Sequence, residues 1–128
     1  MTDSSEMPVY DRVGGPAIAA MVAEFYRLVP QDPVLGPLYP EHDLAAAEAR
    51  LRDFLIYRLG GPPTYLQTRG HPRLRMRHAP FAIGRAERDR WVELMRAGMT
   101  AAGLPADVRE WLDGFLGDIA TFLVNRAG

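Results

Sequence analysis

The chain has 128 residues, which is the length of a single domain with enough residues to bury an apolar core. It has no cysteine, and all 15 basic residues are arginine, which excludes disulfides, thiolate metal sites, covalent haem attachment through Cys-x-x-Cys-His and lysine Schiff bases. A net charge of -1 and the lack of a signal-peptide pattern or long apolar run predict a cytoplasmic protein without nucleic-acid binding or membrane insertion.

The first third of the chain predicts a broken helix followed by a proline-rich connector. Residues 1–7 are expected to form a flexible terminus, and Gly14-Gly15 ends a short turn near Tyr10 before Pro16 opens the next helix. Apolar residues then follow the spacing of one helical face: Ile18, Met21, Val22, Phe25, Tyr26 and Val29. Pro30, Pro33, Pro37 and Pro40 leave room for one helical turn at most, around 34–38.

A second long helix is expected to begin at Asp43, a typical N-cap residue, and to end at Gly60-Gly61-Pro62-Pro63. Its inner face carries Leu44, Ala47, Leu51, Phe54 and Leu55, while Glu48, Arg50, Arg52 and Asp53 are interpreted as solvated. A loop bearing Tyr65 follows. A helix of about two turns at most then lies between Pro72, in its first position, and Pro80.

The last third predicts two further helices. One begins near Arg85 and ends at Gly103 and Pro105, and its inner face carries Trp91, Leu94, Met95, Gly98 and Met99. The other is capped by Asp107 and carries Val108, Trp111, Leu112, Phe115, Leu116, Ile119, Phe122 and Leu123, with Trp111 interpreted as a core residue. Since no segment alternates as a strand does, we predict an all-α domain in which two helix pairs cross.

His78 is the first candidate for a functional residue, because it lies on the short helix, four residues after Leu74 and on the same face. It is either an iron ligand or an ordinary half-buried histidine. Tyr26 and Trp91 are each typical of a helical core when taken alone. Their function depends on what occurs around them.

Six residues occur together and in order: Tyr26, Tyr39, Ala47, Leu51, His78 and Trp91. With the Gly-Gly-Pro breaks at 14–16 and 60–62 and the run from Arg69 to Phe81, they resemble the truncated haemoglobins, most closely their second group, from about Val9 to Asn125. The resemblance implies a single truncated globin domain over 1–128, a two-over-two helical sandwich and one non-covalent haem b with its iron.

By this resemblance His78 is the proximal ligand of the haem iron, and Tyr26, Tyr39 and Trp91 line the distal side. Ala47, where many globins carry a distal histidine, and Leu51 form the distal pocket and its gate. Arg75 is expected to pair with a propionate. The other expected haem contacts, several of which are equally consistent with a plain core, are Phe54, Leu55, Tyr65, Leu74, Phe81, Ile83, Met95 and Phe115.

The chemistry of these residue types agrees with such a site. A histidine that ligates iron offers its second ring nitrogen to a partner, and for His78 we expect the Leu74 carbonyl or a nearby side chain. Dioxygen on ferrous iron carries partial negative charge, so the O–H of Tyr26 and the N–H of Trp91 stabilise it. At about 1.5 kcal/mol each, such donors slow oxygen release roughly tenfold.

Three functions remain open. The first is reversible, tight dioxygen binding at a pentacoordinate ferrous haem, as in oxygen binding or transport. The second is an enzyme that oxidises nitric oxide or reduces peroxide, which needs an external reductase because the sequence has no flavin or nicotinamide signature; no catalytic residue is assigned. The third is a haemless interaction module. Carbon monoxide is a further expected ligand, and a homo-oligomer is left open.

Overall fold

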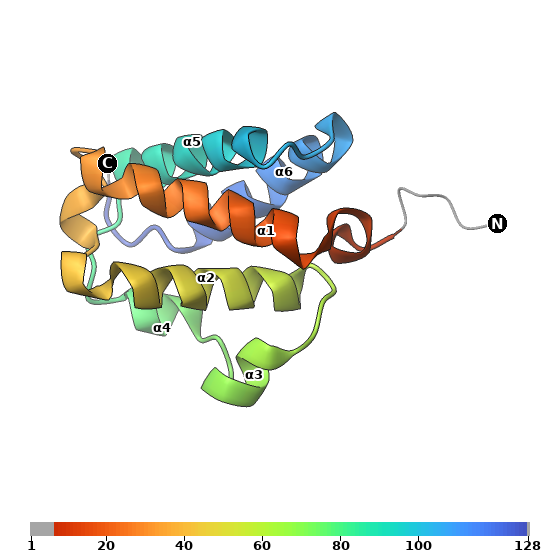
Figure 1. The fold of residues 1–128 in the computed structure, drawn as a ribbon. Helices are drawn as coiled ribbons and strands as arrows, with labels where there is room; N and C mark the ends of the chain where they lie inside the picture. Colours follow the sequence, from red (N-terminus) through yellow and green to blue (C-terminus); the bar gives the residue numbers. More distant parts are fainter. Residues whose placement is uncertain (1–6, 128) are drawn as a thin grey trace.

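The computed structural model describes residues 7–127, and the regular structure in this range is helical (Figure 1). Four helices are long: α1 (Val9–Leu28), α2 (Leu44–Arg58), α5 (Arg85–Ala101) and α6 (Ala106–Phe122). The shorter elements are α3 (Thr64–Arg69), α4 (Leu74–His78) and three 3-10 turns, η2 (Val29–Gln31), η3 (Gly36–Leu38) and η4 (Glu41–Asp43). Residues 7–127 contain no strand, so the all-α prediction is confirmed. The predicted flexible terminus lies outside the described residues except for Met7, which is exposed.

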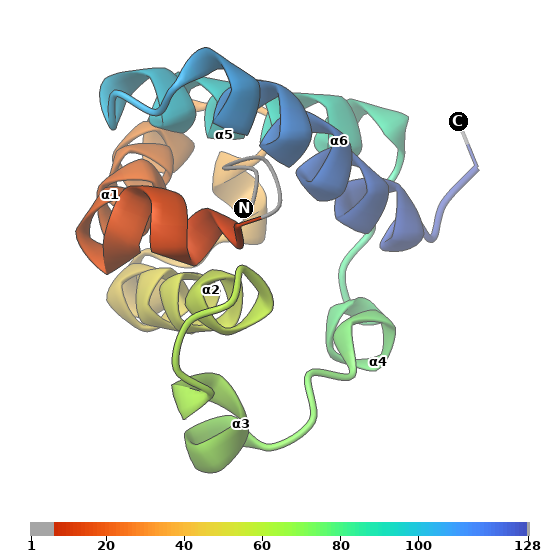
Figure 2. The same cartoon turned by 90° about the vertical axis from the view of Figure 1, so that its right-hand side faces the viewer.

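The long helices form two packed pairs. Helix α1 packs on α2 and on α5, and α5 packs on α6. In Figure 2, α1 lies above α2 and α5 and α6 cross above them, while α3 lies below α2 and α4 lies to the right, below α6. This arrangement confirms the predicted two-over-two sandwich. Among the described residues, no helix has both the length and the apolar content needed to span a membrane.

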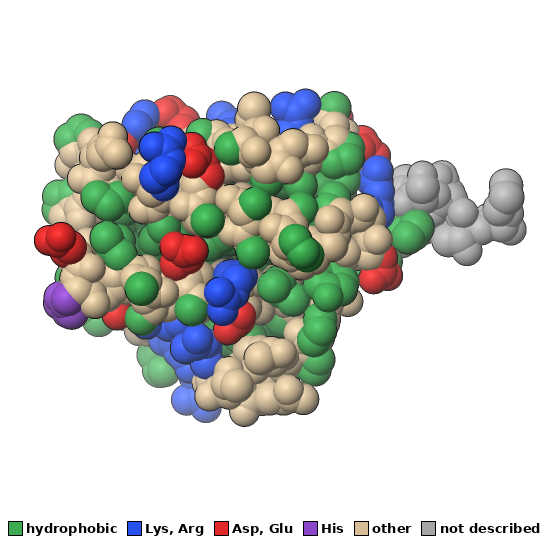
Figure 3. All heavy atoms as spheres, viewed as in Figure 1, with side chains coloured by type: hydrophobic (Ala, Val, Ile, Leu, Met, Phe, Trp, Pro, Cys, Tyr) green, Lys and Arg blue, Asp and Glu red, His purple; other side chains and the backbone are tan. Residues whose placement is uncertain are grey.

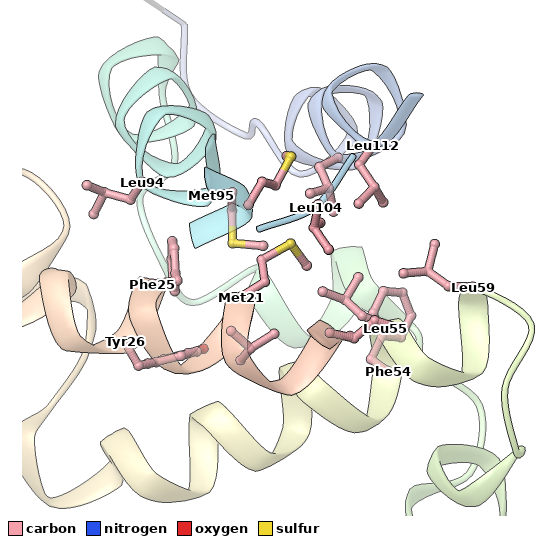
Figure 4. Close-up of a cluster of buried hydrophobic side chains, with 14 of the residues drawn as sticks. Met21, Phe25, Tyr26, Phe54, Leu55, Leu59, Leu94, Met95, Leu104 and Leu112 are labelled. Carbon is pink, nitrogen blue, oxygen red and sulfur yellow. The ribbon is translucent and has the colours of Figure 1, made fainter. Parts of the chain in front are cut away.

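The core lies where α1 meets the other long helices. Met21 and Phe25 of α1 face Met95 of α5, and Leu55 and Leu112 close the cluster from α2 and α6 (Figure 4). Helices α1 and α5 approach closely at Gly98 of α5, where an added Cβ would lie 2.5 Å from the Met21 carbonyl oxygen. Only glycine allows this spacing, because a side chain there would push α1 and α5 apart.

The predicted break in the first helix is confirmed at Gly14. Its backbone has φ 83° and ψ 158°, a conformation that favours glycine, and it separates a short N-terminal turn from the main body of α1. Pro16 follows at the start of that body, where the missing N–H of proline costs little. The break therefore comes from the local sequence and needs no tertiary contact.

The predicted N-cap position of Asp43 is confirmed, but its side chain makes no capping hydrogen bond to α2, because the carboxylate instead accepts one from Arg50, seven residues later on the same helix, at 2.7 Å. Two other predicted helix starts are wrong in detail. Asp107 lies in the first turn of α6 rather than before it, and it forms an ion pair with Arg12 of α1 at 2.7 Å. Pro72 precedes α4 by two residues.

Two further expectations are corrected by burial. Tyr65 does not lie in a loop: it belongs to α3, is 4% exposed and packs its ring on that of Phe54. A helix of six residues is too short to reveal itself by periodicity. Trp111 is 53% exposed and stacks on Phe115, because the buried face of α6 is the narrower stripe of Val108, Leu112 and Leu116.

Candidate functional site

A cavity of about 290 Å³ opens between the helical pairs and the short helix α4. Its wall takes residues from α1, α2, α5 and α6 and from the connector before α2, so segments far apart in sequence meet there. Most of the predicted site residues line it: Tyr26, Tyr39, Ala47, Leu51, Phe54, Leu55, Tyr65, Leu74, His78, Phe81, Ile83 and Trp91. One hollow thus collects residues that the sequence spreads over 66 positions.

Three expected contacts do not line this cavity. Met95 is fully buried in the core between α1 and α5. Phe115 stacks on Trp111 at a ring-centroid distance of 5.2 Å. The guanidinium of Arg75 lies over the ring of Phe122, 5.3 Å from its centroid. All three residues lie on helices that contribute to the cavity wall, but the rotation of each helix about its axis turns these side chains away from the cavity.

Three arginines line the cavity instead: Arg50, Arg77 and Arg88. Arg50, which we interpreted as solvated, is half-buried at the wall beside its ion-pair partner Asp43. It follows Ala47 by three residues and precedes Phe54 by four, so helical spacing already placed it on the cavity face. Arg77 also lines the cavity, and it donates a hydrogen bond to the Tyr65 hydroxyl at 3.1 Å.

Arg77 also ties α4 to the segment before it. Its Nη2 donates to the backbone carbonyls of Arg69 and His71 at 3.2 and 3.3 Å. These carbonyls belong to the end of α3 and to the connector, where Arg73 adopts a left-handed backbone with φ 46°. The side chain of one arginine thereby fixes the entry of the short helix that carries His78.

His78 has one ring nitrogen engaged by the backbone. Its Nδ1 lies 2.7 Å from the Leu74 carbonyl oxygen, one turn earlier, as we expected. A carbonyl only accepts hydrogen bonds, so Nδ1 carries the proton in this arrangement and Nε2 keeps a free lone pair. A histidine held in this tautomer is suited to bind a metal through Nε2.

The exit of α4 is held by Asn125, which the sequence analysis did not identify. Its side-chain oxygen accepts a hydrogen bond from the Ile83 N–H at 2.9 Å, and its side-chain nitrogen donates to the Phe81 carbonyl at 2.9 Å. The chain after α6 therefore closes over the segment that follows His78. A lone asparagine near the end of a sequence carries no local signal of such a role.

An aromatic cluster adjoins the cavity, and three of its members line the wall: Tyr26, Tyr39 and Trp91. The rings of Tyr26 and Tyr39 meet edge to face with centroids 5.7 Å apart, and Phe25 packs between Tyr26 and Trp91 (Tyr26 and Phe25 are seen in Figure 4). Burial raises the pKa of the Tyr39 hydroxyl to about 12, although a hydrogen bond with the Trp91 side chain acts in the other direction. Burial raises the pKa of Tyr26 further, and Tyr39 adds to this effect. Both hydroxyls are therefore neutral donors at physiological pH.

The hydrogen bond between Trp91 and Tyr39 has a fixed direction. An indole nitrogen only donates, so the Tyr39 oxygen is the acceptor and its own hydrogen is left to point elsewhere. From the sequence we expected Trp91 to donate to the ligand and did not expect this contact with Tyr39. Only contacts across the fold, between α5 and the connector, reveal this pairing.

Comparison with known proteins gives the family. The family model described as bacterial-like globin matches residues 8–124. The chain belongs to this family. This globin is 38% identical over 117 residues to a group 2 truncated hemoglobin of Bacillus subtilis, an alignment that covers 91% of this chain and 88% of the relative.

Solved structures agree with this assignment. A thermostable hemoglobin of the actinobacterium Thermobifida fusca is 48% identical with a TM-score of 0.87, over 93% of this chain and 98% of that one. A truncated oxygen-avid haemoglobin of Bacillus subtilis is 38% identical with a TM-score of 0.85, over 91% and 98%. The predicted membership of the group II truncated haemoglobins is therefore confirmed, and haem b with its iron is the cofactor of the homologous globins.

Proposed function

We propose that this globin binds dioxygen reversibly and tightly at one pentacoordinate ferrous haem b, with His78 as the proximal ligand. The observation that carries the proposal is the composition of one cavity wall, which combines an imidazole of fixed tautomer on α4 with the hydroxyls of Tyr26 and Tyr39 and the indole of Trp91. Haem b supplies the iron at which dioxygen binds. The oxygen avidity of the Bacillus subtilis relative supports the same function here.

The residues of the cavity fit a flat apolar group with an acidic edge. Apolar side chains such as Leu51, Leu74 and Ile83 line its wall, and three arginines line it as well. We assign the haem carboxylates to the arginines of the cavity wall, Arg50, Arg77 and Arg88, in place of Arg75, because guanidinium groups pair well with carboxylates and Arg75 does not line the cavity.

The distal residues retain the ligand by donating hydrogen bonds. Tyr26 offers a neutral O–H, because burial opposes its ionisation. Tyr39 offers a second O–H while its oxygen accepts from Trp91, so the indole orients this hydroxyl. Ala47 adds no polar gate, which leaves the aromatic residues to hold the ligand.

The test begins with the proximal residue. We expect purified holoprotein to show an intense Soret band and reversible spectra with oxygen and carbon monoxide. His78→Gly should lose the spectrum of an endogenous fifth ligand and regain it on addition of imidazole, whereas His71→Gly should behave as the wild type, since His71 is exposed and outside the cavity. An unchanged spectrum in His78→Gly would contradict the assignment, and no Soret band after haem-supplemented expression would favour a haemless module.

A second candidate function is turnover at the same site. Hydroxyls buried beside a small ligand are placed to polarise an O–O bond as well as to hold it, which favours oxidation of nitric oxide or reduction of peroxide with an external reductase. Rapid mixing of the oxygenated protein with nitric oxide, and of the ferric protein with peroxide, separates the two functions. Slow reaction with both would leave ligand binding alone.

A further inference from the structure

The charges of this chain are strongly segregated. Residues 54–86 contain six arginines and no aspartate or glutamate, whereas the rest of the chain carries nine arginines against 16 acidic residues. The overall charge of -1 therefore conceals a basic segment on an otherwise acidic protein. This segment contains α3 and α4, and hence His78 itself.

In space, this segment forms a basic surface with apolar residues beside it. Figure 3 shows arginine side chains gathered low on the molecule, near the places of α3 and α4 in Figure 1. Arg73 and Arg75 are exposed, and within the described residues neither forms an ion pair. Large apolar side chains adjoin them: Met76 is 60% exposed, Phe81 39% and Phe122 54%. We call these five residues the proximal patch.

The proximal patch is continuous. Arg75 lies over Phe122 of α6, and the Asn125 side chain joins the segment after α6 to the Phe81 carbonyl. Arg77 is not part of the patch, because its guanidinium is engaged by the Tyr65 hydroxyl and by the carbonyls of Arg69 and His71. Within the described residues, Arg73 and Arg75 are therefore charges that no carboxylate pairs with and that do not line the cavity.

We infer that the proximal patch docks a small acidic one-electron carrier protein that keeps the haem iron reduced. This inference rests on the proposed function, because dioxygen binds the ferrous state and any oxidised iron must be reduced again. Unpaired arginines around exposed apolar residues match a partner with carboxylates around an apolar centre, as in small, transient electron-transfer contacts. Opposite potentials also steer such partners together.

The location of the patch suits electron transfer. Arg75 and Met76 lie on the single turn of helix that ends at His78, so a docked protein is separated from the imidazole by about the diameter of one helix, roughly 10 Å. In each step a carrier such as an anionic flavin hydroquinone becomes the neutral semiquinone, and ferric iron becomes ferrous. One electron moves, and no bond or proton is exchanged.

Extended polyanions are a poorer match than a compact protein. Nucleic acid or an anionic membrane would meet the strongly acidic remainder of this surface as well as the patch, and the protein has no broad positive field to offset that repulsion. A small acidic protein contacts the patch alone. Binding to duplex DNA or to phosphatidylglycerol vesicles is therefore an outcome that the test must compare.

The test uses holoprotein and a flavodoxin as the probe. Binding of oxidised flavodoxin and anaerobic reduction of the ferric haem by its hydroquinone are measured between about 0.01 M and about 1 M salt, where the Debye length falls from about 30 Å to about 3 Å. We expect salt to slow the wild-type reaction at least about tenfold. Arg73→Gln/Arg75→Gln should show weaker binding, about tenfold slower reduction at low salt and a flatter salt dependence.

A matched control removes two charges elsewhere. The double variant Arg27→Gln/Arg96→Gln changes one exposed arginine on α1, which pairs with Glu24, and one on α5, which pairs with Asp113. It should be reduced at a rate within about twofold of the wild type. Equal effects of the two double variants, or no effect of either, would overturn the inference, as would tighter patch-dependent binding to DNA or vesicles than to flavodoxin. The Soret band and the imidazole rescue of His78→Gly report on the proposed function separately, so its failure is recognised before docking is measured.

Discussion

Asp32 and Arg90 form an ion pair across 58 residues of sequence, and it joins the connector after α1 to helix α5. The carboxylate side chain is only 2% exposed, and it accepts hydrogen bonds from Arg90 Nε at 2.9 Å and from the backbone N–H groups of Val34 and Leu35 at 3.0 and 2.8 Å. Arg90 immediately precedes Trp91, and the connector carries Tyr39. One buried carboxylate therefore ties the connector that carries Tyr39 to the helix that carries Trp91.

Removing this carboxylate should destabilise the protein substantially. We expect Asp32→Ala to lower the free energy of unfolding by about 2–3 kcal/mol, because a charged hydrogen bond is lost and two backbone N–H groups lose their acceptor. Urea denaturation measures the change. Asp118→Ala, at an exposed position of α6, should stay within about 0.5 kcal/mol of the wild type. A similar loss in both variants would show that the ion pair has no special part in stability.

The same carboxylate predicts an acid sensitivity. Burial alone would raise the pKa of Asp32, but the hydrogen bonds from Arg90, Leu35 and Val34 together hold it below its ordinary value of 3.8. A lowered folded-state pKa means that the stabilisation is complete above the unfolded pKa and is lost as the pH falls through the folded value. Between about pH 5 and about pH 2, wild-type stability should therefore fall more steeply than that of Asp32→Asn. Parallel curves would contradict the assignment.

A pair of glycine variants tests the helix packing. Gly98→Ala should destabilise the fold by about 2 kcal/mol or more, because the new Cβ would lie 2.5 Å from the backbone oxygen of Met21 and α1 and α5 must separate. Gly114→Ala makes the same chemical change on α6, where a Cβ meets nothing within 4 Å. It should stabilise the helix by up to about 1 kcal/mol. Thermal and urea unfolding of the two variants should thus move in opposite directions.

Sequence reasoning reached the fold because the long helices are marked locally. Gly14 and Pro16 break and restart α1, and the stripe from Ile18 to Val29 has the period of a helix. The short helix α3 escaped it, since six residues around Tyr65 contain too few turns to show a period, whereas Pro72 and Pro80 marked the short helix that carries His78. Reasoning from helical faces also misjudged Trp111, because the width of a buried stripe depends on what packs against it.

The candidate site was predictable in its members but not in its connections. The order of Tyr26, Tyr39, His78 and Trp91 suggested their meeting, and one cavity does collect them. The choice of Arg77 over Arg75 depends on the rotation of a one-turn helix, which a pattern of residues does not specify. The ion pair of Asp32 was equally beyond sequence reasoning, because its partner Arg90 lies on α5, 58 residues later in the chain.

The distal residues should differ in how they slow oxygen release. We expect Tyr26→Phe and Trp91→Phe each to speed dissociation roughly tenfold, the effect of losing about 1.4 kcal/mol of hydrogen bonding. Tyr39→Phe should have a smaller effect, because it also frees the Trp91 N–H to donate to the ligand. Stopped-flow measurement of oxygen dissociation gives all three rates. Tyr57→Phe, outside the cavity wall, should remain within about twofold of the wild type.

Two further measurements make this prediction specific to the proposed pairing. If Trp91 and Tyr39 act as one unit, the effects of Tyr39→Phe and Trp91→Phe should not add in the double variant. Burial also keeps the pKa of Tyr39 near 12 and raises that of Tyr26, so both hydroxyls stay protonated and the wild-type rate should be constant from about pH 7 to about pH 10. Unchanged rates in both Tyr26→Phe and Trp91→Phe would remove the distal donors from the account of ligand retention, because neither hydrogen bond would then contribute to holding dioxygen.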